Sequence, residues 1–207
     1  DEFQVDITCI GEPNLDLNRH DVKEVIFKRL KKIDPYARVT MGASKSRYND
    51  SHFKMGGNLM YTRGSYAGHI CEQGAEKLGR WGYQTFIGKN NKKFTIITMY
   101  RVCKSRNASG ACTIRSQQEK DFFEETGKHC DPREQILIDL KRTIDKLHAE
   151  GQIIIIYGDV NEDVENGKRI NTFLNDTNMK NIASASSIAR FTCLSISFWK
   201  ISSLLST

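Results

Sequence analysis

The fold is decided by the stretch Gln152-Ile153-Ile154-Ile155-Ile156-Tyr157-Gly158-Asp159-Val160-Asn161-Glu162. Its run of isoleucines, which ends at a glycine, predicts a β-strand covered on both faces in the middle of a layered α/β domain. Active-site side chains gather in the turns after such strands, because a rigid sheet holds them in place. Asp159 and Asn161 are two residues apart and point the same way in an extended chain. A proton-accepting carboxylate beside an oxyanion-stabilising amide is a candidate hydrolytic pair, and the open alternative is a polar turn after a core strand.

Other predicted strands also end in polar residues. Val5–Ile10 alternates apolar and polar residues and leads into Gly11-Glu12-Pro13-Asn14. Lys92–Val102 carries a phenol and a guanidinium at its end, and Met55–Tyr61 contains glycines where backbones approach closely. Together these strand ends supply a carboxylate for a hard metal ion, donors for a phosphate and a water-activating acid.

Two predicted helices complete the pattern. One lies within Ser116–Glu125, and a longer one runs over Pro132–Glu150, where apolar residues recur at helical spacing after Asp131-Pro132. Gly151 ends the second helix and the isoleucine strand begins. This strand–helix–strand order favours a layered α/β sandwich.

The order of these motifs resembles the endonuclease/exonuclease/phosphatase superfamily of metal-dependent phosphodiesterases. The matching order is a glutamate after an early strand, a Gly-Gly strand, a strand ending in tyrosine, a helix, and Gly-Asp-x-Asn. Four further segments narrow the resemblance to endonuclease regions encoded by retrotransposons and other retroelements: Arg63–Gly68, Gly79-Arg80-Trp81, Thr95–Cys103 and Gln117-Gln118. The resemblance covers residues 1–180 and implies a DNase I-like fold, with two central, mostly antiparallel sheets flanked by helices and incomplete at both ends.

The resemblance also implies site residues. Glu12 matches the glutamate that holds Mg²⁺ (or Mn²⁺) against the scissile phosphate, and Tyr100 matches the tyrosine that contacts the phosphate. Asp159 matches the aspartate that orients or deprotonates the attacking water, and Asn161 the asparagine that stabilises charge on the phosphorane.

Two more residues are expected to contact the substrate, and both lie where the chain departs from the family pattern. Arg101 is followed by Val102 where many members have x-Pro, and Asn14 follows Gly11-Glu12-Pro13 where Gln-Glu-Thr or similar is usual. We therefore expect no glutamine contact next to Glu12.

Two larger departures concern the ends of the domain. The chain starts too late to contain the family's early asparagine-bearing strand, and it lacks the terminal Ser-Asp-His whose histidine serves in catalysis. None of the five histidines follows Asp159, and we expect each of them on the surface: His20, His52, His69, His129 and His148. We therefore expect a domain truncated at both ends, with activity severely reduced or absent.

Composition fits a single domain with an anionic partner. The 207 residues can bury a real core, and the net charge of +6 favours phosphate neutralisation on DNA, or is simply a basic surface. The six cysteines have no C-x-x-C spacing, so we expect reduced thiols rather than zinc, and an intracellular protein, nuclear or cytoplasmic.

The chain changes character near its end. Residues 1–182 are expected to form the partial domain, and residues 183–207 an atypical serine-rich tail that lacks acidic residues. The tail is too interrupted for a membrane span, so no membrane partner is expected, although a C-terminal anchor is an alternative. A shifted frame, unspliced sequence or a decayed gene copy would explain it.

Three functions stay open. The first is Mg²⁺-dependent phosphodiester hydrolysis by a retroelement-type DNA endonuclease, whose intact parent protein would carry a reverse-transcriptase domain. The second keeps the fold and acts on a lipid or inositol phosphoester. The third is a non-catalytic remnant that binds nucleic acid in a salt-sensitive way.

Overall fold

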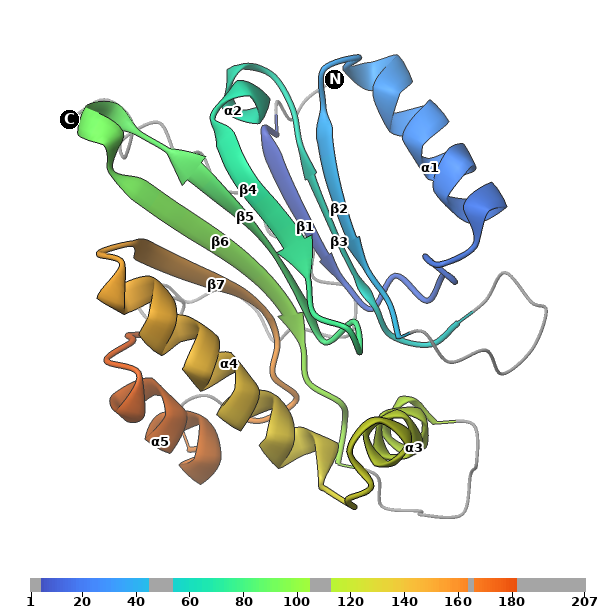
Figure 1. Cartoon of the computed structure of the whole chain (residues 1–207), viewed down its shortest axis with the longest axis vertical. Helices are drawn as coiled ribbons and strands as arrows, with labels where there is room; N and C mark the ends of the chain where they lie inside the picture. The colour runs from blue at the N-terminus through green and yellow to red at the C-terminus, as the bar shows by residue number, and fades with distance from the viewer. Residues whose placement is uncertain (1–4, 45–53, 105–112, 164–165, 182–207) are drawn as a thin grey trace.

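Two β-sheets face each other in the computed structural model, which describes residues 5–44, 54–104, 113–163 and 166–181 (Figure 1). The first sheet is antiparallel and has the strand order β1 (Ile7–Gly11), β3 (Asn58–Thr62), β2 (Arg38–Gly42). The second has the order β4 (Ile70–Ala75), β5 (Trp81–Ile87), β6 (Lys93–Tyr100), β7 (Ile153–Asp159), and its last pair is parallel. The expected α/β sandwich of two mostly antiparallel sheets is confirmed. The tail expected at 183–207 lies outside the described residues.

Helices cover the outer faces of both sheets (Figure 1). The helix α1 (His20–Ile33) lies on the first sheet, while α4 (Pro132–Ala149) and α5 (Lys168–Asp176) lie on the second. The helix α3 (Ile114–Thr126) sits near the end of the sandwich where β6 terminates, and the short elements are α2 (Ser65–Gly68) and a 3₁₀ turn at Lys89–Asn91. Within the described residues, no helix has the length and apolar character needed to cross a bilayer.

Local signals explain both predicted helices. The Thr113 hydroxyl caps α3 by accepting a hydrogen bond from the Ser116 N–H at 3.2 Å. The helix therefore begins at Ile114, two residues before its predicted start at Ser116. Gly127 ends it in the left-handed conformation. The Asp131 carboxylate caps α4 through the Arg133 N–H at 2.9 Å, with Pro132 in the first turn.

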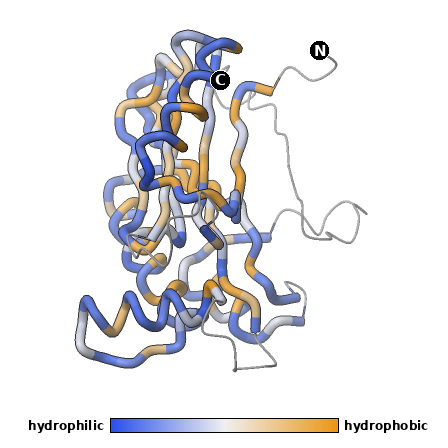
Figure 2. The backbone as a smooth tube through the Cα atoms, turned by 90° about the vertical axis from the view of Figure 1, so that its right-hand side faces the viewer, coloured by the Kyte–Doolittle hydropathy of each residue, from blue (hydrophilic) through white to orange (hydrophobic). Residues whose placement is uncertain are grey.

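The core has one layer between the sheets and another under α4. Phe86 and Phe94 stack between the sheets, with ring centroids 4.8 Å apart. Leu140 and Ile144 of α4 are fully buried against the outer face of the second sheet, where they join Ile97. Hydrophobic stretches are interrupted by hydrophilic ones all along the chain, as expected when each element buries one face (Figure 2).

The isoleucine strand β7 lies at the edge of the second sheet as far as the chain is described, rather than in the middle as predicted. Both of its faces are covered as expected, because Ile154 and Ile156 pack toward α4 while Ile155 and Tyr157 pack between the sheets. All four side chains are only partly buried and Ile153 is 48% exposed, because β6 is the one described neighbour.

Gly158 sets how closely β7 approaches β6. A Cβ atom at this position would lie 2.1 Å from the carbonyl oxygen of Met99, which is far inside van der Waals contact with a backbone atom. Met99 pairs with Gly158 in the parallel ladder, so Tyr100 and Asp159 form the next pair. The glycine therefore places the tyrosine and the aspartate side by side.

We expect Gly158→Ala to destabilise the protein by about 1–3 kcal/mol, because the added methyl group pushes β7 away from a backbone carbonyl. Urea unfolding of the two purified proteins measures this difference. The matched control is Gly68→Ala, since a Cβ there meets nothing within 4 Å. Equal stability of Gly158→Ala and the wild type would contradict the close approach.

Candidate catalytic site at the strand ends

The carboxyl ends of β1, β6 and β7 meet at one end of the sandwich (Figure 1). A Cβ on Gly11, the last residue of β1, would lie 3.5 Å from the Met99 carbonyl oxygen and 3.9 Å from the Tyr100 Cβ. Tyr100 is in turn paired with Asp159 across the β6–β7 ladder. Glu12, which follows Gly11 directly, is thus brought together with Tyr100 and Asp159 from distant parts of the sequence.

Glu12 and Tyr100 interact directly, since the tyrosine hydroxyl donates a hydrogen bond to the carboxylate. Burial raises the pKa of Glu12, the Tyr100 hydrogen bond lowers it and the charge of Asp159 raises it, with a net increase. Burial and the neighbouring Glu12 charge hold the pKa of Tyr100 well above its ordinary value. The phenol therefore stays protonated at neutral pH and acts as a hydrogen-bond donor.

The loop that carries Glu12 is fastened to the segment before β3. Glu12 has a left-handed backbone with φ of 56°, and its N–H donates to the Gly57 carbonyl at 3.0 Å. The Asn14 side-chain oxygen accepts a hydrogen bond from the Gly56 N–H at 3.0 Å, and its backbone N–H donates to the Gly56 carbonyl at 3.3 Å. Asn14, expected as a substrate contact, thus holds the glutamate loop in place.

Asp159 and Asn161 are joined by a turn and do not form the extended pair expected from their spacing. The strand β7 ends at Asp159, and Asn161 has a left-handed backbone with φ of 47°. The Asn161 N–H donates to the Asp159 Oδ1 at 2.8 Å, and the Asn161 side-chain amide donates to the Arg101 carbonyl at 2.7 Å. The turn brings the two residues together and commits one of the two Asp159 oxygens.

Arg101 lies inside the protein, with its side chain fully buried. Its guanidinium donates to the carbonyl oxygens of Arg133 at 2.9 Å and Val160 at 3.2 Å, and to the Glu162 carboxylate at 2.5 Å. Glu134 lies 3.6 Å away. This placement corrects the expected role of Arg101 as a phosphate contact, because its charge is neutralised inside the protein.

Sequence reasoning missed two neighbours of this turn. Arg133 is 6% exposed and binds the carbonyl oxygens of Val102 and Asn161, the latter at 3.0 Å. Cys103 donates its thiol proton to the Asn161 Oδ1 at 3.0 Å. A signal for Arg133 exists in the sequence, because a basic residue in the first turn of a helix opposes the helix dipole and needs another reason to be there.

A hard divalent cation fits the donors at this site, although no group of three His, Cys, Asp or Glu side chains forms a cage anywhere in the described chain. Mg²⁺ keeps several waters and is bound by one or two carboxylates together with substrate phosphates. Glu12 and Asp159 are two such carboxylates, and a cation bound here would offset their mutual repulsion, which adds to burial in raising the pKa of Glu12.

Among the described cysteines, Cys103 contacts the cluster through Asn161. Burial raises the pKa of the Cys9 thiol to about 12, which makes it inert, and no disulfide joins the four cysteines that the structure describes. The four histidines in the described residues are all exposed, as expected, and His52 lies outside that part of the chain.

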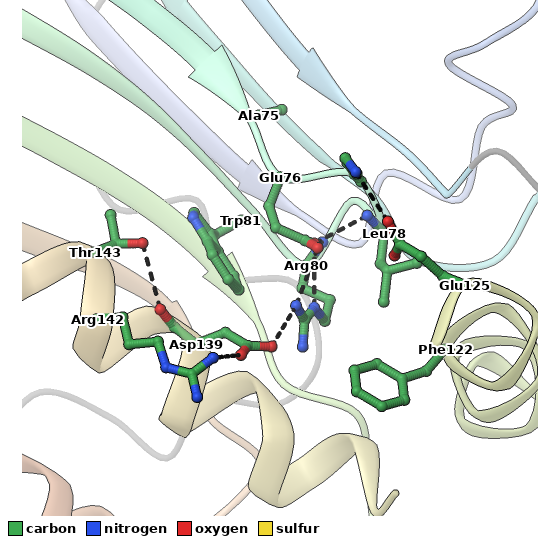
Figure 3. A pocket seen from close by; sticks show the side chains of 11 residues that line it. Ala75, Glu76, Leu78, Arg80, Trp81, Phe122, Glu125, Asp139, Arg142 and Thr143 are labelled. Atoms are coloured by element: carbon green, nitrogen blue, oxygen red, sulfur yellow. Dashed lines mark hydrogen bonds and ion pairs between the residues drawn. The ribbon is translucent and has the colours of Figure 1, made fainter. Parts of the chain in front are cut away.

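A cavity of about 410 Å³ lies between the β4–β5 turn, α3 and α4, and none of the cluster residues lines it (Figure 3). Arg80 stands over the Trp81 ring at 4.9 Å and forms ion pairs with Glu76 at 3.0 Å and Asp139 at 2.9 Å. The Gly79-Arg80-Trp81 motif therefore fastens the second sheet to α4 (Figure 3).

We expect Glu162→Gln to lower the free energy of unfolding by about 1.5–3 kcal/mol at neutral pH, because Arg101 loses its closest counter-charge. Burial raises the pKa of Glu162, but bonds from Arg101 and the Arg169 N–H, together with the arginine charges, lower it overall. A depressed pKa means that the stabilisation is complete above the ordinary value of 4.5 and is lost as the pH falls through the folded-state value.

Urea unfolding as a function of pH tests this prediction. The difference in the free energy of unfolding between Glu162→Gln and the wild type should close as the pH falls below 4.5. The matched control is Glu119→Gln, which breaks a partly exposed pair with Arg115 and should cost less than about 1 kcal/mol. A gap that persists at acid pH would mean that Glu162 stabilises the fold through packing rather than charge.

No protein-family model matches the chain, and no curated protein sequence matches it. Among solved structures it is similar to the catalytic domain of human Nocturnin with bound sulfate, with 13% identity, a TM-score of 0.49, and coverage of 83% of this chain and 57% of that one. Beta toxin 275-280 from Staphylococcus aureus gives 14% identity, a TM-score of 0.49 and coverages of 86% and 60%. An endonuclease/exonuclease/phosphatase family protein from Bacteroides thetaiotaomicron gives 12% identity, a TM-score of 0.40 and coverages of 83% and 70%. The chain thus spans less than two thirds of the first two structures, and its chemistry has to be argued from its own residues.

Proposed function

We propose that the chain catalyses divalent-metal-dependent hydrolysis of a phosphodiester, with DNA as the substrate, in the manner of a retroelement-type endonuclease. The observation that supports this proposal is the meeting of Glu12, Tyr100 and the Asp159–Asn161 turn at three strand ends. These residues follow one another in the sequence in the order of the superfamily motifs, and the fold brings them into one cluster.

Asp159 is suited to activate water. One of its oxygens accepts the Asn161 N–H, which fixes the orientation of the carboxylate. The other oxygen is left to orient a water molecule and take its proton as the water attacks phosphorus. The Asn161 amide donates one proton to the Arg101 carbonyl, which leaves its second N–H for a phosphate oxygen.

Glu12 and Tyr100 supply the other two side chains of the site. Mg²⁺ or Mn²⁺ held by Glu12 would neutralise the charge that develops on the phosphate oxygens. With the Glu12 carboxylate engaged in this way, the Tyr100 hydroxyl can turn from the carboxylate to a phosphate oxygen. Because its pKa is raised, Tyr100 donates this hydrogen bond without losing its proton.

The net charge of +6 supports a polyanionic substrate over a small phosphoester. A lipid or inositol phosphodiesterase would use the same cluster, and competition between DNA and soluble phosphoesters distinguishes the two. A second candidate, a remnant that binds DNA without cleaving it, rests on the same net charge. We propose that an intact parent protein would join the domain to a reverse transcriptase.

We expect the wild-type protein to nick supercoiled plasmid only slowly in Mg²⁺ or Mn²⁺, and Asp159→Ala to reduce that slow rate further, by about 10²–10⁴-fold, because the water loses its base. EDTA should abolish the reaction. The control Asp145→Ala removes a surface carboxylate of α4 and should leave the rate unchanged. Salt-sensitive DNA binding by a folded wild-type protein that never nicks would favour the remnant.

We expect Glu12→Gln to raise the Kd for Mn²⁺ at least about tenfold, because a neutral amide is a weaker ligand than a carboxylate. Calorimetric titration with Mn²⁺ measures this without requiring turnover. Tyr100→Phe is the matched control, since it removes the hydrogen bond to Glu12 and keeps the carboxylate. An unchanged Kd in Glu12→Gln would remove Glu12 from the metal site.

A further inference from the structure

We propose that Arg133 is a positioning residue for the proposed reaction, and that its guanidinium holds the Asp159–Asn161 turn in its productive conformation. The inference rests on the proposed function. It adds a residue from α4, a helix that supplies none of the residues assigned to the cluster above.

The contacts of Arg133 join the chain segments that leave β6 and β7. Its guanidinium donates through Nη1 to the Val102 carbonyl and through Nη2 to the Asn161 carbonyl at 3.0 Å. The first segment follows Tyr100 and the second follows Asp159, so one side chain sets the distance between the two strand exits. Its 6% exposure means that packing fixes the fork in place.

Asn161 has a left-handed backbone with φ of 47°, which asparagine tolerates better than most residues, and the polar contacts around it select this conformation. Each of its polar groups has a partner. The N–H donates to Asp159, the amide donates to the Arg101 carbonyl, its Oδ1 accepts the Cys103 thiol and its carbonyl accepts from Arg133. Among these partners, Arg133 alone reaches the turn from α4.

The choice of arginine is specific. The planar guanidinium has several donors in a rigid fork and can bind two carbonyl oxygens in a fixed relation, whereas a lysine ammonium acts as a point charge. The position is also electrostatically adverse, since it lies in the first turn of α4 and beside the buried Arg101, whose Nε donates to the Arg133 carbonyl at 2.9 Å. Glu162, 3.8 Å from the Arg133 guanidinium, offsets part of this positive charge.

The test is Arg133→Lys, which keeps the charge and removes the fork. Because the Cys103 thiol is bound to Asn161, its alkylation rate by iodoacetamide reports on the turn without requiring catalysis. Mapping alkylated peptides by mass spectrometry should show a severalfold faster reaction at Cys103 and no change at Cys71, an exposed thiol of β4. In the nicking assay, kcat should fall by between about ten and a hundredfold while KM for DNA is unchanged.

The matched control is Arg142→Lys, an exposed arginine on the same helix, which should change neither readout. A folded Arg133→Lys protein with unchanged Cys103 alkylation would overturn the proposal, as would an equal rise at all cysteines, which signals general loosening. If Arg133→Lys does not fold, Arg133→Gln takes its place under the same criteria. A wild-type protein that never nicks would refute the proposed function, whereas the thiol readout would still decide whether Arg133 holds the turn.

Discussion

The burial of one positive charge organises this end of the molecule. Arg101 follows β6 directly and is completely shielded from water, and an uncompensated charge there would cost several kcal/mol. Its counter-charges, Glu134 and Glu162, come from the first turn of α4 and the loop after β7. Burying the guanidinium therefore requires these two segments to meet at the end of β6. The Asp159–Asn161 turn immediately precedes Glu162, so it is placed by the same junction.

Much of the architecture could be predicted from local sequence signals, because periodicity, caps and glycines act over short distances. The helix over Pro132–Ala149 and the strand that ends at Asp159 belong to this class. The edge position of β7 could not be predicted, since four isoleucines look the same in a central strand. The buried direction of Arg101 and the left-handed backbone of Asn161 depend on partners far away in the sequence, which no local pattern reveals.

Motifs shared with a family need not touch a substrate. Gly79-Arg80-Trp81 helped to define the resemblance, yet Arg80 is occupied by Glu76 and Asp139 and stands against Trp81. Its role is to join the second sheet to α4, while its carbonyl accepts the Tyr100 N–H at 2.9 Å. Such a motif stabilises the frame around the candidate site, which explains how it can accompany the site residues in the sequence without sharing their chemistry.

The parallel pairing of β6 and β7 has a consequence for the order in which the protein folds during synthesis. Parallel neighbours need a long crossover, and here α3 and α4 lie between them in the chain. Glu12 leaves the ribosome before Asp159, which lies in the last of the described strands. During synthesis, the β4–β5–β6 meander can form from local contacts, whereas the cluster of Glu12, Tyr100 and Asp159 has to wait for β7. Tyr100 and Asp159 therefore become neighbours only when β7 pairs with β6, after the crossover through α3 and α4 has folded back onto the second sheet.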